Sequence, residues 1–299
     1  MKLLKEVLAL QSETYQEWRV FAFVIRFLKN NNIDFFVDKT GSIYATKGES
    51  EIYPCVVSHM DTVAPIVEDK TIMELNGCLF AMNGVTMERI DIGGDDLVGV
   101  HNCLRTLLEF DDVKAVFFRG EEVGCNGSYE ADVHFFDDCS FVLQFDRKGN
   151  EGFVINACGT ELSSKEFQWS IEGILNNYGY SFVNGGMTDV MALKEIGVSC
   201  NVANIECGYY NPHSDESFVV IKEVEKALQM GFELISTFGY TEFTPHYNSE
   251  YIYKEKTQDP NWYVDELCKD CNAICSENNT GLCITCEQYY GIYETGYIN

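Results

Sequence analysis

Short apolar runs that alternate with amphipathic helices constrain the fold of this chain more than any other feature. The apolar runs lie at residues 54–59, 113–118 and 140–145. Apolar side chains recur at helical spacing in residues 15–30, 95–110 and 220–237. Strands that alternate with helices are typical of a three-layer α/β domain with a largely parallel central sheet. Two hairpins, which turn at Thr40–Gly41 and Asn76–Gly77, interrupt the alternation.

The alternation ends near residue 240. We therefore expect an α/β domain over residues 1–240 and a C-terminal extension over residues 241–299 that is rich in cysteine and aromatic residues. Five of the 13 cysteines crowd into residues 268–286. This use of cysteine is typical of a reducing compartment in which clustered thiolates hold a metal, so we expect a cytoplasmic protein. The first residues also lack the pattern of a secretory signal.

The formal net charge of −26 limits the classes of partner. Nucleic acid backbones and anionic membranes bind cationic surfaces, so the charge argues against both. No run in the sequence approaches the roughly 20 apolar residues of a membrane span.

Histidines and carboxylates follow the predicted strands at the points where the strands end, and ligand sites of α/β sheets form there. In chain order these residues are His59, Asp61, Asp95, Asp96, Glu121, Glu122, Asp146 and His213. Each motif alone is common in proteins that have no site, but their joint occurrence predicts a centre for two divalent metal ions. The donors are imidazole nitrogens and carboxylate oxygens, which fits Zn²⁺, Mn²⁺ or Co²⁺.

The order of these motifs resembles that of the co-catalytic zinc exopeptidases. The order is HxD, GxDDxxG, EExG, a single Asp and a late PHS. That superfamily includes tripeptidases of the peptidase T type, aminoacylases and compact zinc aminopeptidases. The segments SHMDTV, EEVGCNGS and NPHSDES are most similar to the peptidase T branch, and the resemblance covers about residues 1–237. It implies that residues 1–240 are a catalytic domain with two metal ions.

The resemblance also implies which side chain holds which ion. His59 and Asp146 would hold one ion, and Glu122 and His213 would hold the other. Asp95 would bridge both ions. The ions would be zinc, with cobalt or manganese as alternatives.

The remaining carboxylates near these ligands take supporting and catalytic roles by the same resemblance. Asp61 would hydrogen-bond His59 and fix its tautomer, and Asp96 would be structural. Glu121 would be the general base, which takes a proton from an activated water and later passes it to the leaving amine. The reaction would be amide hydrolysis without a covalent intermediate.

Two details bear on the substrate. An Asp at position 146, in place of Glu, goes with the aminopeptidases among these relatives, which suggests trimming at a peptide N-terminus.

Only 66 residues separate Asp146 from His213, and they carry an α/β pattern. The large lid domain of the tripeptidases and aminoacylases does not fit into that segment, so we expect a lidless form.

Without a lid, an oxyanion donor must come from elsewhere in the chain. Tyr209 and Tyr210 are candidates, with core packing as the alternative. Asp189, in GGMTDV, is either a contact for a substrate amine or a helix N-cap.

The C-terminal extension contains two CxxC pairs. Their spacing suits a structural zinc held by Cys268, Cys271, Cys283 and Cys286, and Cys275 could replace one of them. The alternative is a set of free or redox-active thiols. The acidic balance of this extension argues against a nucleic-acid finger and leaves a role in docking or oligomerisation open.

The sequence therefore predicts a zinc-dependent aminopeptidase that acts on short peptides. An N-acyl amino acid amidohydrolase is the alternative within the enzymes. A non-catalytic, metal-binding adaptor that docks through its Cys-rich extension is the alternative from another class. An oligomer is compatible with each of these readings.

Overall fold

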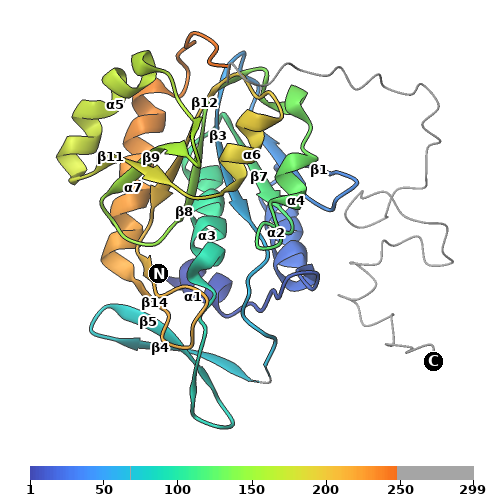
Figure 1. Ribbon diagram of the computed structural model, residues 1–299. Coiled ribbons are helices and arrows are strands. Elements are labelled where there is room, and N and C mark those ends of the chain that lie inside the picture. The colour runs from blue at the N-terminus through green and yellow to red at the C-terminus, as the bar shows by residue number, and fades with distance from the viewer. Residues whose placement is uncertain (68, 248–299) are drawn as a thin grey trace, which may run out of the picture.

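The computed structural model describes residues 1–67 and 69–247. A nine-stranded mixed sheet forms its centre, with helices on both faces (Figure 1). Its strands are β1 (Asp34–Val37), β2 (Ile43–Lys47), β3 (Tyr53–His59), β7 (Val113–Phe118), β8 (Cys139–Arg147), β9 (Gly152–Ala157), β10 (Thr160–Glu161), β11 (Ser181–Gly185) and β12 (Asn201–Glu206). They lie in the order β1-β2-β7-β3-β8-β12-β9-β10, and β11 pairs with β9.

The middle of this sheet is parallel. β3 pairs in parallel with β7 and β8, and β8 pairs in parallel with β12. All seven residues of β3 are buried because both faces of the sheet are covered. Val56 packs into the hydrophobic core on one face, and its neighbour Val57 packs into the core on the other. Continuous apolar runs are therefore the sequence that these strands require.

Four of the five helices on the first face have 13 residues or more, and the helices on the second face have seven or fewer. The first face carries α1 (Lys2–Leu8), α2 (Trp18–Asn30), α3 (Gly94–Glu109), α5 (Lys165–Tyr178) and α7 (Ile221–Phe238). The second face carries the short helices α4 (Asn126–Tyr129) and α6 (Asp189–Glu195) and the 3₁₀ turn η1 (Val133–Phe136). The carboxyl ends of the parallel strands thus open between long helices and short, loop-rich segments.

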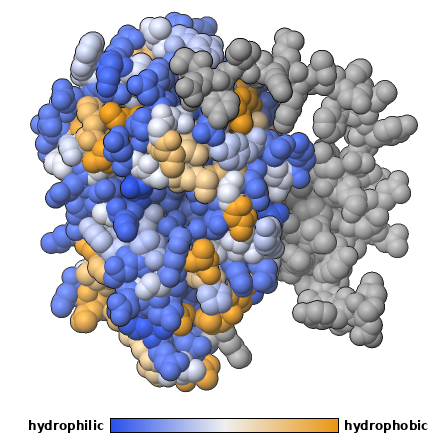
Figure 2. Space-filling view, viewed as in Figure 1, coloured by the Kyte–Doolittle hydropathy of each residue, from blue (hydrophilic) through white to orange (hydrophobic). Residues whose placement is uncertain are grey.

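A second sheet of five strands extends from the main body, and its β4–β5 hairpin projects at the lower end in Figure 1. Its strands are β4 (Lys70–Leu75), β5 (Cys78–Asn83), β6 (Arg89–Ile90), β13 (Tyr209–Tyr210) and β14 (Phe218–Val220). Several apolar side chains of the hairpin, such as Met73 and Leu75, are exposed. Figure 2 shows apolar side chains among polar ones over this lower part of the surface. The loop between β13 and β14 carries His213.

The α/β fold class with a mostly parallel centre is confirmed, as are both hairpins. Residues 147–212 build β9 to β12, α5 and α6 on the main body, so no separate lid domain lies between Asp146 and His213. α7 ends at Phe238, close to the predicted boundary at 240. The proposed zinc ligands Cys268, Cys271, Cys283 and Cys286 lie outside the described residues, so that site stays a prediction.

The eight cysteines within the described ranges are all free thiols, and six of them are buried. The six buried thiols are core residues, whereas Cys78 is half-buried and Cys158 is exposed. None of the helices within residues 1–67 and 69–247 has both the length and the apolar character needed to span a bilayer.

The close approach of α7 to β8 depends on Gly231. A Cβ atom at Gly231 would lie 2.7 Å from Cζ of Phe145, which is fully buried in the core. Gly231→Ala should therefore lower the free energy of unfolding by about 1–3 kcal/mol through overpacking. Gly173→Ala in α5 is the matched control, since its Cβ would meet no atom within 4 Å. Chemical denaturation should show Gly173→Ala stabilised by roughly 0.5–1 kcal/mol, and equal effects at both positions would contradict this account.

Candidate metal centre

The predicted site residues come together at the carboxyl ends of three neighbouring parallel strands. His59 is the last residue of β3, Asp146 lies near the end of β8, and Glu121 and Glu122 follow β7. Asp95 lies in the first turn of α3, whose backbone is not helical at this residue. These segments are far apart in the chain and meet because their strands are adjacent in the sheet.

Asp95 lies between two histidines. Its Oδ1 atom is 3.3 Å from Nε2 of His59, and its Oδ2 atom is 3.3 Å from Nε2 of His213. Nε2 of His59 also lies 3.6 Å from Oδ1 of Asp146, and Nε2 of His213 lies 3.0 Å from Oε1 of Glu122. The structure thus brings together all five side chains that the sequence suggests as metal ligands, with Asp95 shared between two groups.

This donor set fits divalent cations. Donors arranged tetrahedrally at about 2.0–2.2 Å from a zinc ion are roughly 3.3–3.6 Å apart, close to the separations around Asp95. Nε2 of His59 is buried and has no hydrogen-bond partner within the described residues, although three carboxylates surround it. An imidazole nitrogen that faces carboxylate oxygens without a hydrogen bond suits a cation between them. His59, Asp95 and Glu122 form one group that could hold an ion, and His59, Asp96 and Asp146 form another.

Burial, neighbouring carboxylates or both raise the pKa values of three side chains in this centre. Hydrogen bonds to Asp95 and Glu122 raise the pKa of His213 to about 10. Burial, together with the charge of Asp95, raises the pKa of Asp146 to about 7. Burial raises the pKa of Glu121 to about 9, with His59 opposing and nearby carboxylates adding to the shift. The centre therefore stabilises positive charge, as a cation site must.

Asp61 supports both His59 and the loop of the two glutamates. Its backbone carbonyl oxygen is 3.0 Å from Nδ1 of His59, and its carboxylate Oδ1 is 3.4 Å away. The same carboxylate accepts hydrogen bonds from the backbone N–H groups of Glu121 and Glu122 and from the Thr14 hydroxyl. The sequence predicts only the contact of Asp61 with His59, and the structure adds the hydrogen bonds of Asp61 to the backbone of residues 121–122.

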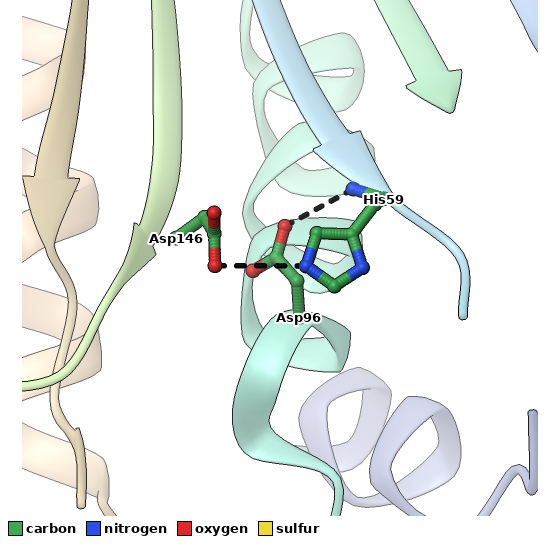
Figure 3. A group of neighbouring side chains, drawn as sticks. All are labelled: His59, Asp96 and Asp146. Atoms are coloured by element: carbon green, nitrogen blue, oxygen red, sulfur yellow. Dashed lines mark hydrogen bonds and ion pairs between the residues drawn. The ribbon is translucent and has the colours of Figure 1, made fainter. Parts of the chain in front are cut away.

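Asp96 has a more specific place than a general structural role. Its carboxylate accepts a hydrogen bond from the backbone N–H of His59 at 3.2 Å (Figure 3). It also accepts one from the backbone N–H of Gly99 at 2.9 Å. A Cβ at Gly99 would lie 2.3 Å from both carboxylate oxygens. Asp96 therefore ties the start of α3 to the end of β3, and only glycine at position 99 leaves room for it.

A buried network that the sequence does not reveal holds Asp146. Nε2 of Gln144 donates to Oδ2 of Asp146 at 3.2 Å and to Oδ2 of Asp189 at 3.0 Å. Oε1 of Gln144 accepts from the Thr188 hydroxyl, and the Asn204 side-chain amide donates to Thr188 and to the backbone oxygen of Asp146. The alternation of side chains along β8 and β12 is consistent with amides that lie beside the site. Polar residues inside strands form no recognisable motif, however, so the sequence alone does not single out Gln144 and Asn204.

Two of the residues suggested for substrate contact have other partners. Asp189 is fully buried, accepts from Ser128 and Gln144, and follows the helix N-cap Thr188. It therefore neither caps the helix nor faces solvent. Tyr210 donates to Glu223, whereas the buried Tyr209 hydroxyl donates to Oδ1 of Asp146 at 3.2 Å. Only Tyr209 reaches the centre.

The loop that carries His213 is fixed by Asp91 and Ser217, which the sequence does not single out. The Ser217 hydroxyl donates to Oδ1 of Asp91 at 2.7 Å and accepts from the backbone N–H of Ile92 at 2.8 Å. Oδ1 of Asp91 also accepts from the backbone N–H of Gly93. This pair joins the approach to Asp95 with the loop of His213, although 126 positions separate the two residues in the chain.

Comparison with solved structures places this arrangement in a known fold. An aminopeptidase PepT from Bacillus cereus is 13% identical with a TM-score of 0.63, and 78% of this chain and 96% of that chain are covered. A tripeptidase from Staphylococcus aureus is 13% identical with a TM-score of 0.64, over 80% and 97% of the two chains. The chain shares the fold of these two peptidases.

A third structure with this fold is the TET1 peptidase of Pyrococcus horikoshii. It is 16% identical with a TM-score of 0.60, and 78% of this chain and 98% of that chain are covered. That protein can assemble into a tetrahedron or a large octahedral shell. No protein-family model and no curated protein matches the sequence.

The Gln144 network generates a prediction that separates stability from ion binding. Gln144→Leu should lower the free energy of unfolding by about 1–3 kcal/mol, because Asp189 and Thr188 lose buried partners. It should also weaken metal binding by about 10–100-fold, since Asp146 loses its orienting bond. Gln168→Leu is the control: this buried amide donates to Ser163 away from the centre. Both variants should be destabilised in denaturation, but only Gln144→Leu should lose metal affinity in calorimetric titration.

Metal binding should grow stronger with pH. His213, whose pKa is raised to about 10, carries a proton at neutral pH and must release it to act as a ligand. The apparent affinity for Zn²⁺, Mn²⁺ or Co²⁺ should therefore rise between about pH 6 and pH 9, with release of protons. Calorimetry in buffers of different ionisation enthalpy measures both effects. His213→Ala should abolish one binding event, and His134→Ala, at an exposed histidine paired with Asp137, should leave the titration unchanged.

Proposed function

We propose that this chain is a metal-dependent exopeptidase that removes residues from the N-terminus of short peptides, with two divalent ions, zinc in the first place. The position of Asp95 between His59 and His213 carries the proposal, because one carboxylate with a histidine at each oxygen suits a pair of adjacent ions. The aminopeptidase and tripeptidase described above share the fold and support peptides as the substrate class.

In this proposal His59 and Asp146 would hold one ion and Glu122 and His213 the other, with Asp95 shared between the two groups. Two bound ions would supply Lewis acidity, which polarises a scissile carbonyl and lowers the pKa of a water molecule. Asp61 orients His59 and keeps the 121–122 backbone in place through its hydrogen bonds.

Glu121 is the proposed general base. Oε2 of Glu121 lies 3.9 Å from Nε2 of His59, so this carboxylate faces the same centre as the ligands. The pKa of Glu121 is raised to about 9 by burial, so the carboxylate has a high proton affinity before cations compensate the nearby charge. It takes the proton of the attacking water and delivers it to the leaving amine.

Tyr209 is the proposed neighbour of the scissile carbonyl. Its hydroxyl donates to Oδ1 of Asp146, the oxygen that also faces His59. In the substrate complex this hydroxyl keeps Asp146 oriented.

The proposal also includes an assembly of several copies, such as the one that the TET1 peptidase can form, and a cytoplasmic location.

A peptide-library digest tests the function. The metal-loaded protein should remove residues stepwise from N-termini, as mass spectrometry of the products would show. Glu121→Gln should lower kcat by about 100- to 10,000-fold while the metal content stays the same. Glu172→Gln, on the exposed side of α5, is the matched control and should keep full activity.

Other outcomes of the digest would redirect the proposal. Loss of residues from C-termini would overturn the aminopeptidase assignment. An unchanged library with all three metals would rule out general exopeptidase activity, and the N-acyl amino acids would become the substrates to test.

A further inference from the structure

Cys125 is a buried cysteine with a carboxylate as its neighbour. It is fully buried, yet it belongs to neither of the two hydrophobic clusters that contain the other five buried cysteines of the described ranges. Its Sγ atom donates to Oε1 of Glu121, the proposed general base, at 3.5 Å. Among the described residues, no other group forms a hydrogen bond with the Glu121 carboxylate. The orientation of this carboxylate therefore depends on a thiol.

A tight turn brings residues 121 and 125 together. The carbonyl oxygen of Glu121 accepts hydrogen bonds from the backbone N–H groups of Gly124 and Cys125, both at 2.9 Å. Cys125 has a φ of +56°, in the left-handed region that residues other than glycine rarely adopt. The Ser128 hydroxyl lies 3.1 Å from the Cys125 carbonyl oxygen and donates to Asp189 at 2.6 Å. The buried network around Asp189 thus maintains an unfavourable backbone conformation, and such conformations cluster at functional sites.

The thiol turns the carboxylate of Glu121 toward the centre. Oε1 faces Sγ of Cys125, which leaves Oε2 on the side of His59, 3.9 Å from its Nε2 atom. The last side-chain torsion of a glutamate has no sharp preference of its own, so a neighbour must fix it. A general base works only within hydrogen-bond reach of the proton that it takes. The contact with Cys125 therefore bears directly on the rate of the reaction.

A thiol suits this task because it is a weak donor. A lysine or arginine in its place would form an ion pair with Glu121 and lower the pKa of that carboxylate, which would make it a weaker base. Burial raises the pKa of the Cys125 thiol, and the charges of Asp189 and Glu121 add to the shift. The sulfur thus keeps its proton and can orient the carboxylate with little loss of basicity.

We propose that Cys125 is a positioning residue for the general base: its thiol holds Oε1 of Glu121 so that Oε2 faces the centre. This inference rests on the proposed exopeptidase function. The thiol acts on the base and does not itself touch the peptide, so its loss should appear in kcat and not in KM.

Kinetics with trialanine as the substrate test this role in the metal-loaded protein. Cys125→Ala should lower kcat by about 3- to 10-fold and change KM less than about twofold. Cys125→Ser should recover part of the loss, because it restores a donor on the same Cβ atom and meets the same backbone strain as alanine. Cys139→Ala is the control: this buried thiol lies at the start of β8, away from the centre, and its loss should leave kcat unchanged.

A double-mutant comparison separates positioning from a general structural role. The residual turnover of Glu121→Gln can be followed by mass spectrometry over long incubations. In that variant the further change Cys125→Ala should lower kcat less than about twofold, because the thiol acts through the carboxylate that is already lost. An equal loss in both backgrounds, or no loss in either, would overturn the role of Cys125 and leave the exopeptidase function intact.

Infrared spectroscopy of the metal-loaded protein tests the contact without any activity. The S–H stretching band of Cys125 is assigned by its loss from the Cys125→Ala variant. It should lie at a lower frequency in the wild type than in Glu121→Ala, because a donated hydrogen bond weakens the S–H bond. If the wild type cleaves no peptide, the proposed function fails by itself, and this band decides the inference: a shift supports the hold on Glu121, and an equal frequency refutes it.

Discussion

Mutual repulsion among buried carboxylates is the constraint on which this structure depends. Asp95, Asp146, Glu121 and Glu122 meet near the ends of three adjacent strands. Burial raises the pKa of Asp146 and of Glu121 and so disfavours their charged forms. A polypeptide can keep such a group together only if hydrogen bonds fix the backbone beneath it and if positive charge is supplied. His59 and His213 supply part of this positive charge, and the geometry around Asp95 suits the proposed cations, which would supply the rest.

The hydrogen bonds beneath the centre form three separate supports. Asp61 and Asp96 hold the backbone of Glu121, Glu122 and His59. Gln144 orients Asp146, and the pair of Asp91 and Ser217 secures the loop of His213. Each support connects two elements that are distant in sequence. The positions of the ligands are therefore set by tertiary contacts, although each ligand belongs to a short local motif.

The difference between short local motifs and tertiary supports explains which features the sequence predicts and which it does not. Continuous apolar runs such as residues 113–118 and helical spacing in 220–237 predicted the layers correctly, because both depend on local periodicity. The five suggested ligands meet because His59, Glu122 and Asp146 lie at or next to the ends of adjacent strands, and Asp95 and His213 lie on segments that reach the same ends. Gln144, Asn204 and Ser217 could not be found in this way: a polar residue within or beside a strand has no distinctive spacing, and its role appears only when a partner from another strand reaches it. The helix N-cap considered for Asp189 is wrong by one residue, because Thr188 takes that position and the Asp189 carboxylate accepts from Ser128 and Gln144.

The loop of His213 belongs to the second sheet, whereas His59 and Asp146 belong to the first. His59 is fully buried, but the side chain of His213 is 47% exposed. If the proposed ions bind, the two groups of ligands should exchange them at different rates. An ion at Glu122 and His213 would leave after a local opening of the β13–β14 loop, whereas an ion at His59 and Asp146 would need rarer motions of the core. Occupancy at Glu122 and His213 would then follow the free metal concentration, and the ion at His59 and Asp146 would be retained for longer.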